Sequence, residues 1–200
     1  MTQKHWIFGY GSLICQDSRS RTGSSGEALP VKIEGLERSW NVPLADADLS
    51  VVGIRQQSGH RAGGMLFPVE EDQLPLFDAR EREYQRVELF PEAIETLDAR
   101  LLPQGSFWVY LPPEQESPHP IAQSYLDVIL HGCLQQGRDF AQDFLATTTA
   151  WKQRLDDRQQ PLYARPLRPR QQAEWLPEID SLLEDFFSTR QAGSSDKSPA

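Results

Sequence analysis

Seven short segments with the composition of β-strands fill the first 111 residues, and this series limits the possible folds more than any other feature. Most of them are rich in Val, Ile, Phe, Trp or Tyr, and turn residues separate them. The segments are 5–9, 36–43, 49–55, 62–69, 84–89, 94–102 and 106–111. So many strands in so short a stretch predict a strongly curved sheet or a small mixed β-barrel.

Helical patterns interrupt and follow these strands, so the expected fold class is α+β. The spacing of apolar residues predicts a short helix over 71–81, with Pro75 in its first turn and Glu81 at its end. Beyond Pro120 the apolar period becomes helical. One helix should stop near Gly137, Asp139 should cap the next, and a last amphipathic helix should carry the apolar residues from Leu176 to Phe187.

Polar and proline-rich stretches suggest the domain boundaries. Residues 16–30 are rich in Gly and Ser and are expected to form a mobile surface loop. We expect a barrel domain over 1–151 and a C-terminal extension over 152–190. This extension should consist of a Pro/Arg-rich loop, whose arginines pair with the protein's own carboxylates or bind phosphate, and a helix that packs on the barrel. Residues 191–200 have the composition of a disordered tail.

Charge and composition exclude several classes of function. The net charge of −9 offers no attraction for nucleic acid. Neither a secretory signal nor a membrane-spanning segment is evident, and Cys15 and Cys133 are expected to be free and buried, so we expect a cytoplasmic protein. The four histidines show no metal-binding spacing, so neither a metal nor a cofactor is expected.

The first candidate motif is FGYGSL, residues 8–13, where an apolar strand ends in two glycines and a serine. Glycines that adopt positive φ would make a sharp turn and aim several backbone N–H groups the same way, which is a site for a carboxylate or an oxyanion. An ordinary Gly-Ser loop is the alternative. The motif is neither a P-loop nor a nucleophile elbow, and no histidine near Ser12 is available to act as its base.

The second candidate is FDAREREYQRVEL, residues 77–89, in which Glu81 continues the apolar face of the predicted helix. Partial burial would raise the pKa of this carboxylate into the range useful for proton transfer, provided that Arg80 and Arg82 point away. The alternative is a surface stretch of alternating charge over 78–86.

The order and spacing of these two motifs resemble the gamma-glutamylcyclotransferase superfamily, most closely its ChaC-like or AIG2-like branch. The resemblance covers residues 5–111 well and is looser up to Trp151. It implies a small mixed β-barrel with flanking helices that converts the γ-glutamyl group of a small molecule to 5-oxoproline and releases the attached amine, without a cofactor. It also implies roles for six residues: Tyr10, Gly11, Ser12 and Leu13 hold the γ-glutamyl group, Glu81 is the general acid and base, and Tyr84 contacts the substrate.

The chain departs from the family pattern after the glutamate, where Arg82-Glu83 replaces one or two glycines. Glu83 is therefore an alternative to Glu81 as the general acid and base. The departure also keeps open an alternative function, a module that binds a γ-glutamyl or other amino-acid metabolite without turnover. The sequence does not choose among glutathione, γ-glutamyl amino acids and γ-glutamylamines.

Overall fold

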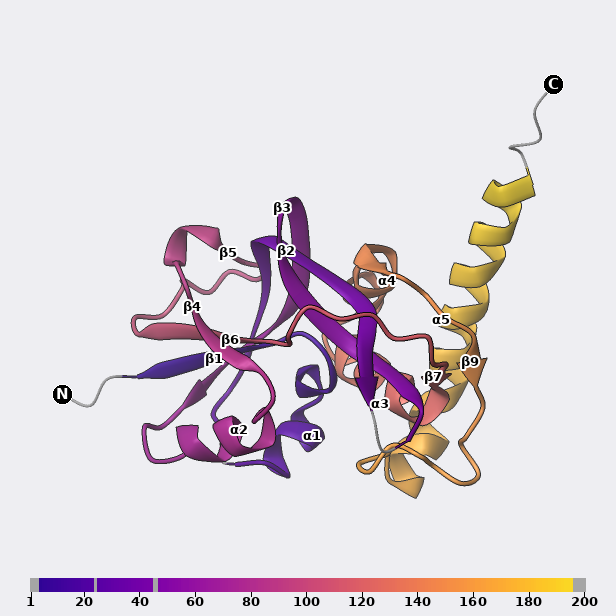
Figure 1. The fold of residues 1–200 in the computed structure, drawn as a ribbon, viewed down its shortest axis with the longest axis horizontal. Coiled ribbons are helices and arrows are strands. Elements are labelled where there is room, and N and C mark those ends of the chain that lie inside the picture. The colour runs from indigo at the N-terminus through magenta and orange to yellow at the C-terminus, as the bar shows by residue number, and fades with distance from the viewer. Residues whose placement is uncertain (1–3, 24, 45–46, 196–200) are drawn as a thin grey trace.

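The computed structural model describes residues 4–23, 25–44 and 47–195, with side chains described as far as Arg190 (Figure 1). Within these residues the chain forms one nine-stranded sheet and five α-helices, which confirms the expected α+β class. The strands are β1 His5–Gly9, β2 Leu29–Leu44, β3 Leu49–Val69, β4 Gln85–Leu89, β5 Ile94–Thr96, β6 Ser106–Leu111, β7 Ile121–Ala122, β8 Thr148–Thr149 and β9 Arg154–Leu155. The helices are α1 Gln16–Ser20, α2 Leu74–Arg80, α3 Gln123–Leu134, α4 Arg138–Thr147 and α5 Pro169–Ser195, with 3₁₀ turns η1 Ser12–Ile14 and η2 Pro91–Ala93.

The sheet is curved but open, so the expected small barrel does not close. Its main path runs β4-β6-β1-β3-β2-β5, and β1 pairs antiparallel with β3 and parallel with β6. Among the described strands, β4 pairs only with β6 and β5 only with β2. The strand predicted over 94–102 is limited to Ile94–Thr96, and Leu101 is 90% exposed. With so short a strand at one end, the two ends of the sheet do not pair.

The strands β2 and β3 form one long hairpin, where the sequence predicts three shorter strands. β3 unites the segments predicted over 49–55 and 62–69, and β2 begins at Leu29 rather than at 36. Residues 55–61 are exposed and polar, and several of them bulge out opposite Gly35. A polar bulge in a strand has the same sequence pattern as a turn, which is why the segments appeared separate.

The segment 16–30 is not simply a mobile surface loop, as the sequence suggested. Residues 16–20 form α1, and Arg19 is only 4% exposed. Its guanidinium donates hydrogen bonds of 2.7 Å to the carbonyls of Leu13 and Ile14. A buried cation therefore fixes the residues that follow β1, an interaction that a polar composition does not reveal.

The predicted helices are largely confirmed, with changes at their ends. Pro75 lies in the first turn of α2, and Glu81 follows its last residue. Asp139 does not cap α4, because Gly137, with a φ of +111°, precedes the helix and places Asp139 in its first turn. The last helix, α5, continues to Ser195, five residues into the segment expected to be disordered; residues 196–200 lie outside the described residues.

Helices α3, α4 and α5 cover one side of the sheet, and α1 and α2 lie at its lower edge in Figure 1. All residues of α3 are buried, because this helix packs against η1 as well as α4 and α5. Ile179, Leu182 and Leu183 of α5 belong to the same core cluster as the strands, so the C-terminal helix packs on the rest of the fold.

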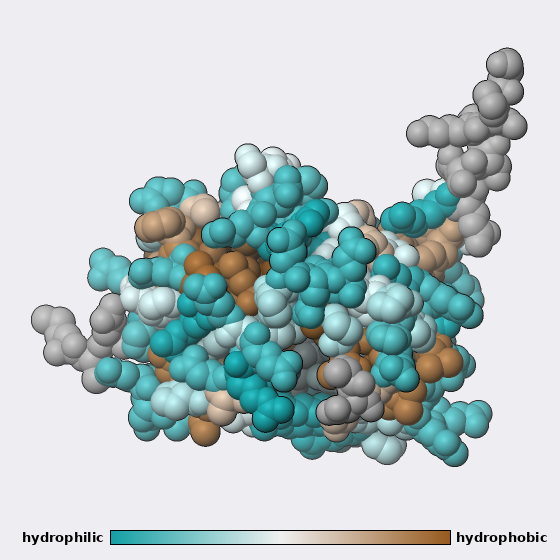
Figure 2. Space-filling view, in the orientation of Figure 1, coloured by the Kyte–Doolittle hydropathy of each residue, from teal (hydrophilic) through white to brown (hydrophobic). Residues whose placement is uncertain are grey.

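The surface viewed in Figure 2 is mainly hydrophilic. No described helix combines the length and hydropathy needed to cross a lipid bilayer.

Candidate active site

The FGYGSL motif forms the tight turn between β1 and η1. A Cβ atom added at Gly9 would lie 2.7 Å from the Cβ of Leu13, and one at Gly11 would lie 3.1 Å from the hydroxyl of Tyr125. Neither glycine has a positive φ, so the expected conformational reason was wrong. Glycine is needed at position 9 because Leu13 of the same turn approaches too closely for a side chain, whereas a Cβ atom at position 11 would require only a small shift of the Tyr125 hydroxyl.

Three backbone N–H groups of this turn have no hydrogen-bond acceptor among the residues that the structure describes. The first intrahelical bonds of η1 are donated by Ile14 and Cys15. Among the backbone hydrogen bonds of the described residues, none uses the N–H of Gly11, Ser12 or Leu13. Donors at the start of a helical turn lack intrahelical partners, and together they favour an anionic group.

Glu81 stands at the end of α2, where a glycine-free turn follows it. Its N–H donates to the carbonyl of Phe77 (2.9 Å), and its carbonyl accepts from the N–H of Tyr84 (2.7 Å). Arg82 and Glu83, which stand where the motif has glycine, are not among the described non-glycine residues with positive φ, so this turn needs no glycine. The Glu81 side chain is 17% exposed, whereas that of the rival Glu83 is 78% exposed. Of the two carboxylates, Glu81 is the enclosed one.

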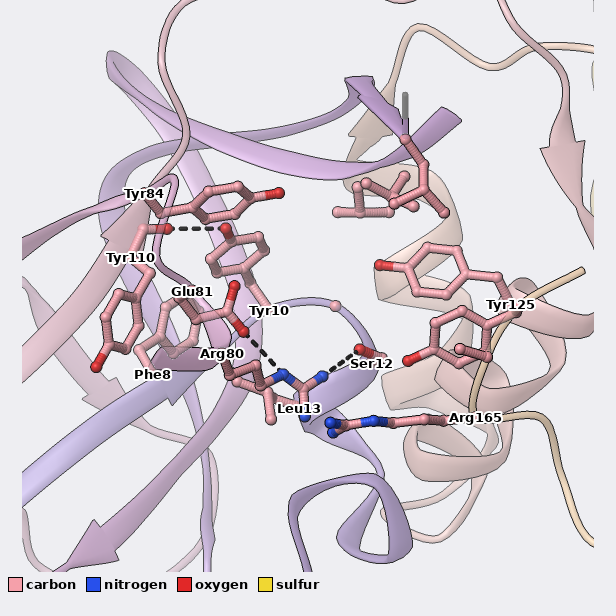
Figure 3. A pocket seen from close by; sticks show the side chains of 17 residues that line it. Phe8, Tyr10, Ser12, Leu13, Arg80, Glu81, Tyr84, Tyr110, Tyr125 and Arg165 are labelled. Atoms are coloured by element: carbon pink, nitrogen blue, oxygen red, sulfur yellow. Dashed lines mark hydrogen bonds and ion pairs between the residues drawn. The ribbon is translucent and has the colours of Figure 1, made fainter. Parts of the chain in front are cut away.

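Arg80 connects the two motifs. Its Nε atom lies 2.9 Å from Oε1 of Glu81, and one of its terminal nitrogens donates to Oγ of Ser12 over 3.0 Å. The other donates to the Thr22 hydroxyl over 2.6 Å. The strand-to-turn motif and the helix-end motif, about 70 residues apart in sequence, therefore meet in one hydrogen-bonded group (Figure 3).

The pKa of the Glu81 carboxyl is raised, because burial penalises the charged form more than the nearby cations stabilise it. Arg80 opposes the shift most strongly, and Arg165 opposes it more weakly. The sequence-based condition that Arg80 point away is therefore not met, although Arg82, with a side chain 81% exposed, does point away. The direction of the pKa shift is nevertheless the one expected for a group that exchanges protons near neutral pH.

A cavity of about 390 Å³ lies between these groups and is lined by all six residues expected to form the site. They are Tyr10, Gly11, Ser12, Leu13, Glu81 and Tyr84. Their proximity is a property of the fold, and their roles remain predictions. The volume is within the range of pockets that hold small molecules.

The cavity also contains residues that the sequence did not indicate. Tyr110 comes from β6, Tyr125 from α3, and Tyr163 and Arg165 from the segment before α5. Apolar residues of the β2–β3 hairpin, Leu44, Val51 and Val52, complete the lining. No sequence pattern could have joined these positions, because they come from separate elements that only the tertiary fold brings together.

Three tyrosines that line the cavity, Tyr10, Tyr84 and Tyr125, act as neutral hydroxyl groups. Burial, as the main cause, raises the pKa values of Tyr10, Tyr84 and Tyr125. The Tyr10 hydroxyl donates to the backbone carbonyl of Tyr110 over 2.8 Å. These side chains therefore supply hydrogen bonds and apolar ring surface, and they do not add negative charge to the cavity.

The charges that line the cavity are unbalanced. Of the described residues that form its wall, Arg80, Glu81 and Arg165 are the charged ones, which gives two cations and one carboxylate. Together with the free N–H groups of the turn, they make the cavity suited to a small molecule that carries an anionic group and exchanges protons with one carboxylate.

The curved sheet, the turn after β1 and the carboxylate after α2 define a protein with the gamma-glutamyl cyclotransferase fold. A solved structure described as a gamma-glutamyl cyclotransferase matches with a TM-score of 0.62 and 14% identity, over 86% of this chain and 97% of that chain. An uncharacterized protein from Homo sapiens matches with a TM-score of 0.54 and 15% identity, over 78% and 95% of the two chains. YkqA from Bacillus subtilis matches with a TM-score of 0.51 and 16% identity, over 66% of this chain and 49% of that one.

Neither a family model nor a curated protein matches the chain. At 14–16% identity, the structural matches show a shared fold, which confirms the fold expected from the two motifs. The activity must therefore be argued from the site itself.

Proposed function

We propose that the protein is a gamma-glutamylcyclotransferase, which cyclises the γ-glutamyl group of a small molecule to 5-oxoproline. The observation that carries this proposal is the position of Glu81, an enclosed carboxylate with a raised pKa, in the same cavity as the free N–H groups of the Gly11–Leu13 turn. The shared fold supports it.

The chemistry requires little from the protein beyond orientation and proton transfer. The α-amino nitrogen attacks the γ-carbonyl carbon four bonds away, a C–N bond forms, and the bond to the released amine breaks. Because the attack is intramolecular, a well-oriented substrate has an effective molarity of roughly 10⁵ M or more. The enzyme needs neither a nucleophile of its own nor a metal for this step.

Glu81 moves the protons in the proposed reaction. The attacking ammonium group must lose two protons as it becomes the amide nitrogen of the ring. The departing nitrogen gains protons as it leaves as an amine. One carboxylate with a raised pKa performs both transfers in turn. The N–H groups of the Gly11–Leu13 turn bind the α-carboxylate or the developing oxyanion, and Tyr84, which also lines the cavity, contacts the substrate.

The test is incubation of the pure protein with glutathione, γ-glutamyl dipeptides and γ-glutamyl-lysine, followed by an assay for 5-oxoproline. The proposal predicts product from at least one substrate class. No product from any of them would refute it.

A binding module without turnover is the second candidate. It is favoured by the contact between Arg80 and Glu81, because a cation at 2.9 Å stabilises the ionised carboxylate and weakens it as a base. A γ-glutamyl compound would then raise the melting temperature of the protein without forming 5-oxoproline. Substantial turnover would exclude this candidate.

A further inference from the structure

Two residues of the FDAREREYQRVEL motif, Asp78 and Arg86, have no part in the proposed reaction and are not among the described residues that line the cavity. Asp78 lies in α2, three residues before Glu81, and Arg86 lies in β4. One terminal nitrogen of Arg86 lies 2.8 Å from each of the two carboxylate oxygens of Asp78. This ion pair therefore joins the two elements on either side of the turn that carries Glu81.

The exposed half of this turn contributes little to the position of Glu81. The side chains of Arg82 and Glu83 are 81% and 78% exposed, so they add almost no packing. Strand pairing restrains the chain after the turn on one side only, because β4 pairs with β6 alone among the described strands. A side-chain link across the turn therefore adds a restraint that neither the packing of residues 82–83 nor a second neighbouring strand supplies.

Both partners of the pair are held in place by β6. The Arg86 guanidinium lies over the ring of Trp108, 5.0 Å from its centroid, and Nε1 of Trp108 in turn donates to Nδ1 of His5 over 3.1 Å. The Asp78 carboxylate also accepts a hydrogen bond of 2.8 Å from the Tyr110 hydroxyl. Side chains that other contacts already order lose less conformational entropy when they pair than mobile surface side chains do, so this pair is a geometric restraint.

Tyr110 connects the pair to the wall of the cavity. Its hydroxyl donates to Asp78, whereas its backbone carbonyl accepts the 2.8 Å hydrogen bond from the Tyr10 hydroxyl. Burial, with a smaller contribution from the Asp78 carboxylate, raises the pKa of Tyr110, so this hydroxyl stays protonated and remains a donor. In Figure 3, Tyr110 directs its hydroxyl away from Ser12 and Tyr125 while its carbonyl meets Tyr10. Asp78 is therefore connected through one residue to Tyr10 of the first motif.

We propose that Asp78 and Arg86 position Glu81 for proton transfer by closing the turn between α2 and β4. This inference rests on the proposed cyclotransferase function and adds two positioning residues to it. The pair acts through the backbone of Glu81, because the hydrogen bonds of the described residues place Arg80, and neither member of the pair, on its carboxylate. The order of Asp, Glu and Arg in the motif then has a physical reason, since the first and the last meet across the turn that begins at Glu81.

The test is a double-mutant cycle with Asp78→Asn, Arg86→Gln and the two combined. It measures kcat and KM for 5-oxoproline formation from whichever of glutathione, γ-glutamyl-alanine and γ-glutamyl-lysine the wild-type protein turns over fastest. Asp78→Asn keeps an oxygen that accepts from the Tyr110 hydroxyl. Each single variant should lower kcat by about 10-fold, because even a small misplacement of a reacting group is costly. The double variant should lose about as much as either single variant, and KM should stay within about twofold.

The matched control is a second Arg–Asp pair that is also partly exposed. Arg138 of α4 pairs with Asp185 of α5 over 2.7 Å, and neither is among the described residues that line the cavity. Their side chains are 34% and 67% exposed, against 30% and 43% for Arg86 and Asp78. Arg138→Gln and Asp185→Asn should leave kcat within about twofold. Urea denaturation should show similarly small losses of stability for both pairs, which separates positioning from a general effect on folding.

Three kinetic results would overturn the inference. The first is an unchanged kcat in the variants of the Asp78–Arg86 pair. The second is a pair of single losses that multiply in the double variant, because the two residues would then not act as a unit. The third is a KM that rises by as much as kcat falls, or more, because the pair would then act on substrate binding.

A wild-type protein that forms no 5-oxoproline would instead refute the proposed function, and the positioning of Glu81 is then decided without turnover. Carbon-13 NMR measures the pKa of its carboxyl group, with the signal assigned by its loss in Glu81→Gln. The double variant of the pair keeps the net charge, and Arg80 and Arg165 remain the charged groups that face Glu81. Its Glu81 pKa should fall toward the ordinary carboxyl value, because a loosened turn admits water to the carboxylate. An unchanged pKa would overturn the inference.

Discussion

Replacing Glu81 with glutamine isolates the proton-transfer step from substrate binding. The side chain keeps its size, and its amide oxygen still accepts from Nε of Arg80, but the titratable group is lost. General acid–base catalysis contributes roughly 10²–10⁴-fold, or about 2.7–5.4 kcal/mol of activation free energy, so kcat should fall by that factor. Of the described residues that line the cavity, Glu81 is the only carboxylate, and no neighbour there can replace it.

The assay is 5-oxoproline formation with kcat and KM determined separately, because a proton-transfer residue affects kcat more than KM. Glu83→Gln is the control. The Glu83 side chain is 78% exposed, and this variant should keep kcat within a few-fold. A Glu83→Gln protein without activity, together with an active Glu81→Gln protein, would refute the assignment of the general base.

The same pair of variants tests the burial of Glu81 through protein stability. Because the pKa of Glu81 is higher in the folded state than in the unfolded chain, the ionised carboxylate destabilises the fold at neutral pH. Glu81→Gln should therefore raise the free energy of unfolding at pH 7. This gain should disappear as the pH falls below the unfolded-state pKa of about 4.3. Urea denaturation at a series of pH values measures it, and a Glu81→Gln protein less stable than wild type at neutral pH would contradict this reasoning.

Three further variants probe the neighbours of Glu81. Arg80→Gln removes the cation that opposes the rise of the Glu81 pKa, so the acidic limb of the kcat/KM profile should move to higher pH; an unmoved limb would show that Arg80 does not control this carboxylate. Gly11→Ala places a Cβ atom about 3.1 Å from the Tyr125 hydroxyl and should raise KM with little loss of stability, and an unchanged KM would exclude the turn from substrate binding. Asp157→Ala leaves the Ser124 N–H, the Ser124 hydroxyl and the Leu162 N–H without their acceptor and should lower the free energy of unfolding by about 1–3 kcal/mol in urea denaturation, whereas an unchanged value would show that Asp157 does not anchor the segment before α5.

Local sequence patterns were sufficient to predict most strands and helices. They also located the two candidate motifs, residues 8–13 and 77–89. β1 and β6 lie where alternating or continuous apolar runs end at turn residues, and α2 begins where Pro75 requires it. These features depend on residues close in sequence, because backbone conformation and burial of one face follow from local side chains. The burial of the Glu81 side chain could also be predicted, because Glu81 continues the apolar face of the helix that precedes it.

The tertiary structure decided what surrounds Glu81. Arg80 reaches the cavity from α2, the hydroxyl of Tyr125 from α3, and the guanidinium of Arg165 from the segment before α5. It also decided that β3 continues through the polar residues 55–61 and that the sheet stays open. Contacts between distant segments depend on the packing of the whole chain, and neither the apolar period nor the composition of a short window contains that information.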